Sequence, residues 1–352
     1  MAYTEIDKPS DYFNTVVYTA DQQANRVISG VGFQPDFVWL KNRNQNVTHD
    51  LYDAVRGATK ALHSNSSSAE TNQPDGLIAF NSDGFTVDTS WGNYATGNSY
   101  ASWNWKANGT GSSNSDGSIT STVSANTTAG FSVVKFVGNE TSGATVGHGL
   151  GSVPAMIMVK KISTGSSQNW RVYHKGTDAS APQDYDLKLN LTNAKDNDNT
   201  VWNDTAPTSS VFTLGNTSSI NASGATMIAY SFAEKKGFSK FGSYTGNGST
   251  DGTFVYTGFK PAFIIVKRTD SASQWRMWDN KRNTFNVVNK ALLPNDSSEE
   301  QENSSQNIDF LSNGFKLRAD YADTNASGGT YIYMAFAENP FVSSTGIPGP
   351  AR

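Results

Sequence analysis

The sequence predicts an all-β protein made of three tandem antiparallel β-sandwich domains, of either jelly-roll or lectin-like type. A proline-entered apolar segment that ends in lysine occurs three times, at 32–41, 153–160 and 258–267. This pattern is typical of a buried strand entered from a loop. The chain is also only 16% charged and is rich in Gly, Ser, Thr and Asn. Such a composition favours turns and short strands over long helices.

Further matched segments surround each proline-entered strand. A strand that ends in an aromatic residue precedes it, a strand with large residues near alternate positions follows it, and a strand with aromatic residues at every second position closes the unit. The first of these segments are 12–18, 130–136 and 238–244, the second are 49–53, 170–174 and 275–279, and the last are 100–105, 227–232 and 331–336. The period of two is the strongest argument for strands. The proline-entered runs are continuously apolar, so we expect both of their faces to be covered.

The repeats predict the domain boundaries. We expect a first domain with an N-terminal arm, a Gly/Ser/Asn-rich linker, two further domains and an extended tail. These segments are 1–106, 107–116, 117–234, 235–342 and 343–352. Because only a short segment separates the second and third domains, we expect those two to pack together while the first hinges on its linker.

Composition excludes several classes of function. A net charge of −4 and a pI of about 5.6 give no electrostatic reason to bind nucleic acid. Cysteine is absent, which excludes disulfides and thiolate metal sites. The N-terminus has no basic segment followed by an apolar one, and no apolar run approaches membrane-spanning length. We therefore expect a soluble protein made without a secretory signal and not inserted in a membrane.

Signatures of catalysis and of cofactor or metal binding are weak, so we expect no enzyme activity, cofactor or metal. The four histidines lack metal-ligand spacing, and His49 occupies the position of a tryptophan in the other two repeats. The segment 97–101 resembles a nucleophile elbow but leads into a strand instead of a helix. Segment 196–199 offers oxygen ligands for calcium but lacks the glycine and distal glutamate of an EF-hand loop, which favours an ordinary loop.

Aromatic residues outside the repeated positions give the clearest binding signal. Trp91 and Trp202 lie in polar, Asn-rich segments without a counterpart in the other repeats. An aromatic face flanked by amides or carboxylates suits a sugar ring, although packing against a neighbouring domain or subunit is the alternative. The predicted glycan-binding residues are Trp91, Asn93, Tyr94, Trp202, Asn203 and Asp204.

Several motifs together resemble a family of repeat-bearing structural proteins of tailed bacteriophages, especially marine and cyanobacterial ones. They are the opening segment 3–13, segment 34–41, the turn at 81–85, the close of the first repeat at 103–109 and the ending 337–341. The resemblance covers nearly the whole chain. It implies a virion structural protein of tail-fibre, receptor-binding or capsid-surface type, assembled in the host cytoplasm, and it brings no catalytic residues.

Two roles compete within that class. A tail-fibre or host-recognition component would touch glycan through loops 88–98 and 196–208, whereas a capsid decoration protein would dock on other virion proteins through its termini. A polysaccharide depolymerase is a third possibility and would need paired carboxylates at one glycosidic bond. The resemblance also implies a homo-oligomer, with a trimer as one option, although no heptad or collagen-like segment supports it.

Overall fold

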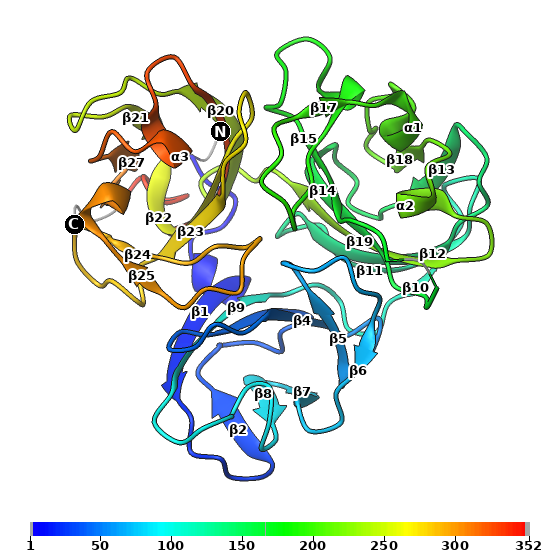
Figure 1. Ribbon diagram of the computed structural model, residues 1–352, viewed down its shortest axis with the longest axis horizontal. Coiled ribbons are helices and arrows are strands. Elements are labelled where there is room, and N and C mark those ends of the chain that lie inside the picture. Colours follow the sequence, from blue (N-terminus) through cyan, green and yellow to red (C-terminus); the bar gives the residue numbers. More distant parts are fainter. Residues whose placement is uncertain (1–2, 166, 349–352) are drawn as a thin grey trace.

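The computed structural model describes residues 3–165 and 167–348, and its strands pair antiparallel throughout the named sheets. The expectation of an all-β protein is confirmed. Figure 1 shows three lobes that follow one another along the chain and surround a common centre. Helix in the described residues is limited to short segments: η1 (Pro9–Asp11), η2 (Pro182–Asp184), η3 (Ser304–Gln306), α1 (Asn199–Trp202), α2 (Ser218–Asn221) and α3 (Ala322–Asn325).

The first lobe contains a large sheet on the inner side and a small sheet on the outer side (Figure 1). The large sheet has the order β1 (Phe13–Thr19), β9 (Ser99–Trp105), β3 (Phe37–Asn42), β4 (His49–Asp53), β5 (Lys60–His63), β6 (Thr71–Asn72). The small sheet has the order β2 (Arg26–Ser29), β8 (Gly84–Val87), β7 (Leu77–Asn81). The predicted turn at 81–85 joins β7 to β8.

The other two lobes repeat this plan. The large sheet of the second lobe has the order β10 (Ser112–Asn114), β11 (Ser121–Asn126), β12 (Phe131–Val137), β19 (Thr226–Ala233), β14 (Pro154–Lys161), β15 (Arg171–His174). One small sheet of this lobe pairs β13 (Ala144–Gly147) with β18 (Val211–Leu214), and another pairs β16 (Tyr185–Asp186) with β17 (Asp196–Asn197). The large sheet of the third lobe has the order β20 (Ser239–Thr245), β28 (Thr330–Pro340), β22 (Phe259–Arg268), β23 (Trp275–Asp279), and its small sheets are β21 (Phe254–Tyr256), β27 (Gly314–Leu317), β26 (Ile308–Leu311) and the pair β24 (Lys290–Ala291), β25 (Gln301–Glu302).

The proline-entered strands lie between two cores. In β3 every residue is buried, because alternate side chains point to opposite faces of the sheet. Phe37 and Trp39 enter an apolar cluster shared by all three lobes, whereas Val38 and Leu40 enter a cluster confined to the first lobe. The expectation that both faces of this strand are covered is confirmed.

The shared cluster, which we call the central core, holds the lobes together. Trp105 is almost fully buried there, with ring centroids of six phenylalanines from the three lobes between 4.9 and 6.4 Å away. Phe232 and Phe336 occupy the matching positions in β19 and β28 and also belong to the central core. The expectation that the first lobe hinges is therefore wrong, because its large sheet buries its inner face against both other lobes.

The lysine that ends each proline-entered strand also joins neighbouring lobes. Lys41 Nζ donates to Ser297 O at 2.9 Å, Lys160 Nζ to Ser67 O at 2.7 Å and Lys267 Nζ to Thr192 O at 2.9 Å. The first contact links lobe one to lobe three, the second lobe two to lobe one, and the third lobe three to lobe two. The contacts are therefore cyclic. Burial lowers the pKa of each lysine to about 8.

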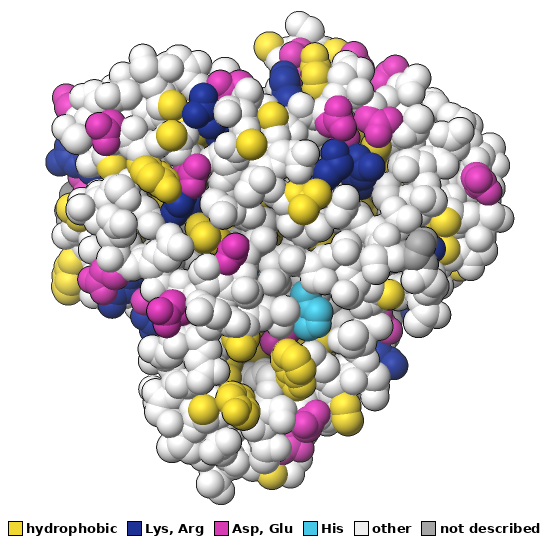
Figure 2. Space-filling model, in the orientation of Figure 1, with side chains coloured by type: hydrophobic (Ala, Val, Ile, Leu, Met, Phe, Trp, Pro, Cys, Tyr) yellow, Lys and Arg dark blue, Asp and Glu magenta, His cyan; other side chains and the backbone are white. Residues whose placement is uncertain are grey.

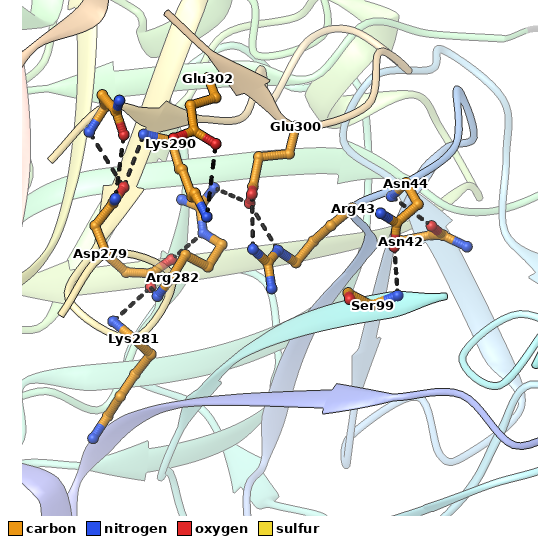
Figure 3. Close-up of polar contacts among 12 residues, drawn as sticks. Asn42, Arg43, Asn44, Ser99, Asp279, Lys281, Arg282, Lys290, Glu300 and Glu302 are labelled. Atoms are coloured by element: carbon orange, nitrogen blue, oxygen red, sulfur yellow. Dashed lines mark hydrogen bonds and ion pairs between the residues drawn. The ribbon is translucent and has the colours of Figure 1, made fainter. Parts of the chain in front are cut away.

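A buried charge network spans the boundary between the first and third lobes (Figure 3). The Arg43 guanidinium donates two hydrogen bonds of 2.7 Å to Glu300, a bidentate geometry that strengthens the pair. Glu300 also accepts from Arg282, which pairs with Asp279. Asp279 in turn accepts from the indole nitrogen of Trp103 in β9 at 3.1 Å. The charged groups of this network are thus paired where they are removed from water.

The described parts of both chain ends lie against the third lobe. Tyr3 packs on Phe341 and its hydroxyl lies 2.7 Å from that of Tyr256, while Asp7 accepts a hydrogen bond of 2.7 Å from the backbone N–H of Ser344. The predicted tail 343–352 is described only as far as 348, and the rest lies outside the described residues.

The segment predicted as a linker, 107–116, is part of the fold. Ala107 is buried and its N–H donates to Asp36 at 2.7 Å, and β10 within the segment pairs with β11. The segment therefore leads directly from the central core into the large sheet of the second lobe.

Candidate binding site

A surface pocket of about 290 Å³ opens on the first lobe. It lies where the ends of β3, β4 and β9 meet the loop that follows β8. Figure 2 shows hydrophobic side chains around a hollow on this lobe, at the bottom of the view. The pocket is lined by Asn42, Gln45, Val47, Asp50, Ser90, Trp91, Tyr94 and Tyr100.

Two exposed aromatic side chains form one side of the pocket. Trp91 is 42% exposed and Tyr94 is 52% exposed, which is unusual for aromatic residues of this size. Trp91 also has a positive φ of 27°, a conformation that side-chain-bearing residues seldom adopt. The loop thus holds the Trp91 indole at the surface, and contacts elsewhere in the loop must stabilise the unusual backbone conformation of this residue.

Asn93 anchors this loop through hydrogen bonds inside the lobe and does not line the pocket. It is fully buried; its Oδ1 atom accepts from the N–H of Asp21 at 3.0 Å, and its Nδ2 atom donates to Asp21 and to the carbonyl of Gln23. Asn221 and Asn325 make the same kind of contacts at the ends of α2 and α3. The prediction that Asn93 binds glycan is therefore wrong, because this amide is a shared scaffold element.

A carboxylate lies in the pocket wall. Asp50 is only 6% exposed; its Oδ1 atom lies 2.9 Å from Nδ1 of His63 and accepts from the Thr48 hydroxyl at 3.2 Å. Among the described residues, its Oδ2 atom has no recorded partner. Burial raises the pKa of this carboxyl, while the contacts with His63 and Thr48 oppose the shift. The His63 ring lies 6.2 Å from that of Trp91, so this pair adjoins the aromatic side.

The register of the sheets explains why the pocket occurs in this lobe. Asp50 pairs with Leu40 across β3 and β4, as Arg171 pairs with Val159 and Arg276 with Val266 in the other lobes.

Those arginines are engaged within their own lobes. Arg171 bonds Ser219 in α2 and pairs with Asp186, and Arg276 pairs with Asp323 in α3 at 2.7 Å. In the first lobe a short aspartate replaces the long arginine, and a loop carrying Trp91 replaces the helix. These two replacements leave space for the pocket and put a negative charge where the other lobes have a positive one.

The polar groups at the floor of the pocket form hydrogen bonds with one another. Asn42 Nδ2 donates to the Tyr100 hydroxyl at 3.1 Å, and the N–H of Tyr94 donates to the same hydroxyl at 3.2 Å. The Tyr100 ring stacks on Tyr18 at 5.3 Å, and burial raises the pKa of Tyr100. These groups shape the floor, while Asp50 provides the acceptor that is free for a ligand.

Trp202 is not a surface platform. It is only 2% exposed and packs edge-on against Tyr173, at 6.0 Å between ring centroids, in the core of the second lobe. Asp198 accepts from the N–H of Thr200 and so begins α1 as its N-cap, which directs Val201 and Trp202 inward. The prediction of an exposed indole here is wrong, because its polar neighbours cap a helix.

The residues beside Trp202 have local roles. Asn203 ends α1 in the left-handed conformation and accepts from Ser142 at 2.6 Å, and Asp204 is exposed with a φ of 46°. The structure therefore does not bring Asn203 and Asp204 together with Trp202 around a pocket. In the segment weighed as a calcium loop, Asp196 pairs with Lys188 at 3.2 Å.

The described residues include no group of three or more His, Cys, Asp or Glu side chains placed to hold a metal ion. Within the same residues, no helix has the length and apolar character needed to cross a membrane. The pocket offers two exposed aromatic side chains and a carboxylate acceptor.

Comparison with known proteins places the chain in a family. The model of a family described as a domain of unknown function (DUF7483) matches residues 8–340. The chain belongs to this family. The match runs through all three lobes in one stretch. No curated protein and no solved structure matches the chain.

Proposed function

We propose that this chain is a non-enzymatic structural protein of a bacteriophage virion that recognises a glycan on the host surface. The pocket on the first lobe carries the recognition part of this proposal. It combines exposed Trp91 and Tyr94 with the free oxygen of Asp50, which matches the apolar face and the hydroxyls of a sugar ring.

The virion part of the proposal is supported by the sequence resemblance to repeat-bearing phage structural proteins. The fold is compatible with that role, because three lobes closed around one core give a stable unit without disulfides. We interpret each lobe as a β-sandwich of jelly-roll or lectin-like type, since each has its own apolar cluster between a large and a small sheet.

A binding assay with a matched control tests the recognition role. The purified protein is applied to an array of bacterial surface oligosaccharides, alongside Trp91→Ala and Phe285→Ala. Phe285 is a control because it is 78% exposed and lies on the third lobe. We expect Trp91→Ala to weaken binding by about tenfold or more, as for a central aromatic contact, and Phe285→Ala to bind like the wild type. Equal binding by all three proteins, or no binding to any glycan, would refute the role.

Capsid decoration is the alternative role. It was predicted to use the termini, but the described parts of both ends pack on the third lobe. Binding to assembled particles without any glycan binding would favour decoration, and release of reducing sugar would show a depolymerase.

A further inference from the structure

We propose that the pocket on the first lobe accepts uncharged sugars and rejects acidic ones such as uronic acids. This inference rests on the proposed glycan-binding function and specifies its ligand class. It follows from which hydrogen-bonding atoms of the pocket remain unused and from which charges surround them.

The pocket wall offers an unused acceptor. An ionised carboxylate only accepts hydrogen bonds, and the Oδ2 atom of Asp50 has no recorded partner among the described residues. Sugar hydroxyls can donate to this atom.

A ligand carboxylate would meet Asp50 without a compensating cation. The eight lining residues include neither lysine nor arginine. The Lys41 ammonium behind the wall is buried and is engaged by the carbonyls of Gln45 and Val47 as well as Ser297, and Arg43 is paired with Glu300. Two like charges at close range in a partly desolvated pocket repel strongly, which provides selection against the wrong ligand.

The other lobes show what the first lobe has changed. At the same sheet position they carry Arg171 and Arg276, each paired with an internal carboxylate. The first lobe carries a carboxylate whose second oxygen is left for an external donor. The first lobe therefore differs from the other two at this position both in having a pocket and in carrying a negative charge.

The test compares two oligosaccharides that differ only in carrying a terminal hexose or the corresponding uronic acid. Affinities for both sugars are measured by calorimetry in the same buffer. We expect the wild type to bind the neutral sugar at least about tenfold more tightly than the acidic one. Asp50→Asn should reduce this ratio to below about threefold, because the amide removes the charge and keeps the shape.

Asp204→Asn is the matched control, since it removes one exposed carboxylate from the second lobe. It should leave the ratio unchanged, and both variants should show the wild-type thermal unfolding temperature. If the wild type binds both sugars equally, or if Asp204→Asn changes the ratio as much as Asp50→Asn does, the charge-selection inference is wrong while glycan binding stands. If the wild type binds neither sugar nor any array glycan, the proposed function fails and the inference fails with it.

Discussion

Replacing Trp105 by alanine should destabilise all three lobes together. Its indole is almost fully buried and touches phenylalanine rings from each lobe. Removing a buried tryptophan costs about 3 to 5 kcal/mol through lost transfer free energy and the cavity left behind. Against a typical total of about 5 to 15 kcal/mol, this is a large share of the free energy of unfolding.

Hydrogen exchange measured peptide by peptide, together with urea unfolding, distinguishes the shared core from a local one. We expect Trp105→Ala to speed exchange in strands of all three lobes, and the milder Trp105→Phe to do so to a smaller extent. Phe85→Ala is the control, since Phe85 is equally buried but belongs to the core of the first lobe alone. If Trp105→Ala speeds exchange only in the first lobe, as the control should, then the lobes are independent and the central core does not join them.

Four further variants test the lobe contacts and the site. The free energy of unfolding should rise from pH 8 to about 9.5, because the unfolded chain keeps lysine protons that the folded chain releases at a pKa of about 8. Since three lysines contribute, Lys160→Met should remove about a third of this pH dependence in urea titrations. An unchanged pH dependence in this variant would contradict the assignment. Asn93→Ala and Asn325→Ala should each lower the free energy of unfolding by about 1 to 3 kcal/mol in the same titrations. Only Asn93→Ala should also weaken glycan binding, and equal effects of the two variants on binding would contradict a local anchoring role. Asp50→Arg should fill the pocket and abolish binding while the thermal unfolding temperature stays within a few degrees, and retained binding would place the ligand elsewhere.

Sequence patterns predicted the local structure well. Period-two aromatic residues and continuous apolar runs identified β9, β19 and β28 and the proline-entered strands, because side-chain alternation is a local property of a strand. The same patterns did not predict that the lobes share a core. Trp105 looks like any buried strand residue, and only the closed arrangement shows that its neighbours come from distant segments.

The candidate site was only partly predictable for related reasons. Trp91 and Tyr94 were found because they have no counterpart in the other repeats. Trp202 was misassigned because polar neighbours indicate a surface in a loop but can also cap a short helix, and the capping aspartate was the signal that could have corrected it.

Asp50 was missed as a pocket residue. The exchange of Arg171 and Arg276 for an aspartate was visible in the aligned repeats, but its meaning required the sheet register and the helix partners of the two arginines.

The most direct test of the account is a crystal structure of the protein soaked with a neutral oligosaccharide that it binds. The account predicts a sugar ring stacked on Trp91, with a hydroxyl within hydrogen-bonding distance of the Asp50 Oδ2 atom. A sugar bound on another lobe, with the pocket of the first lobe empty, would contradict it.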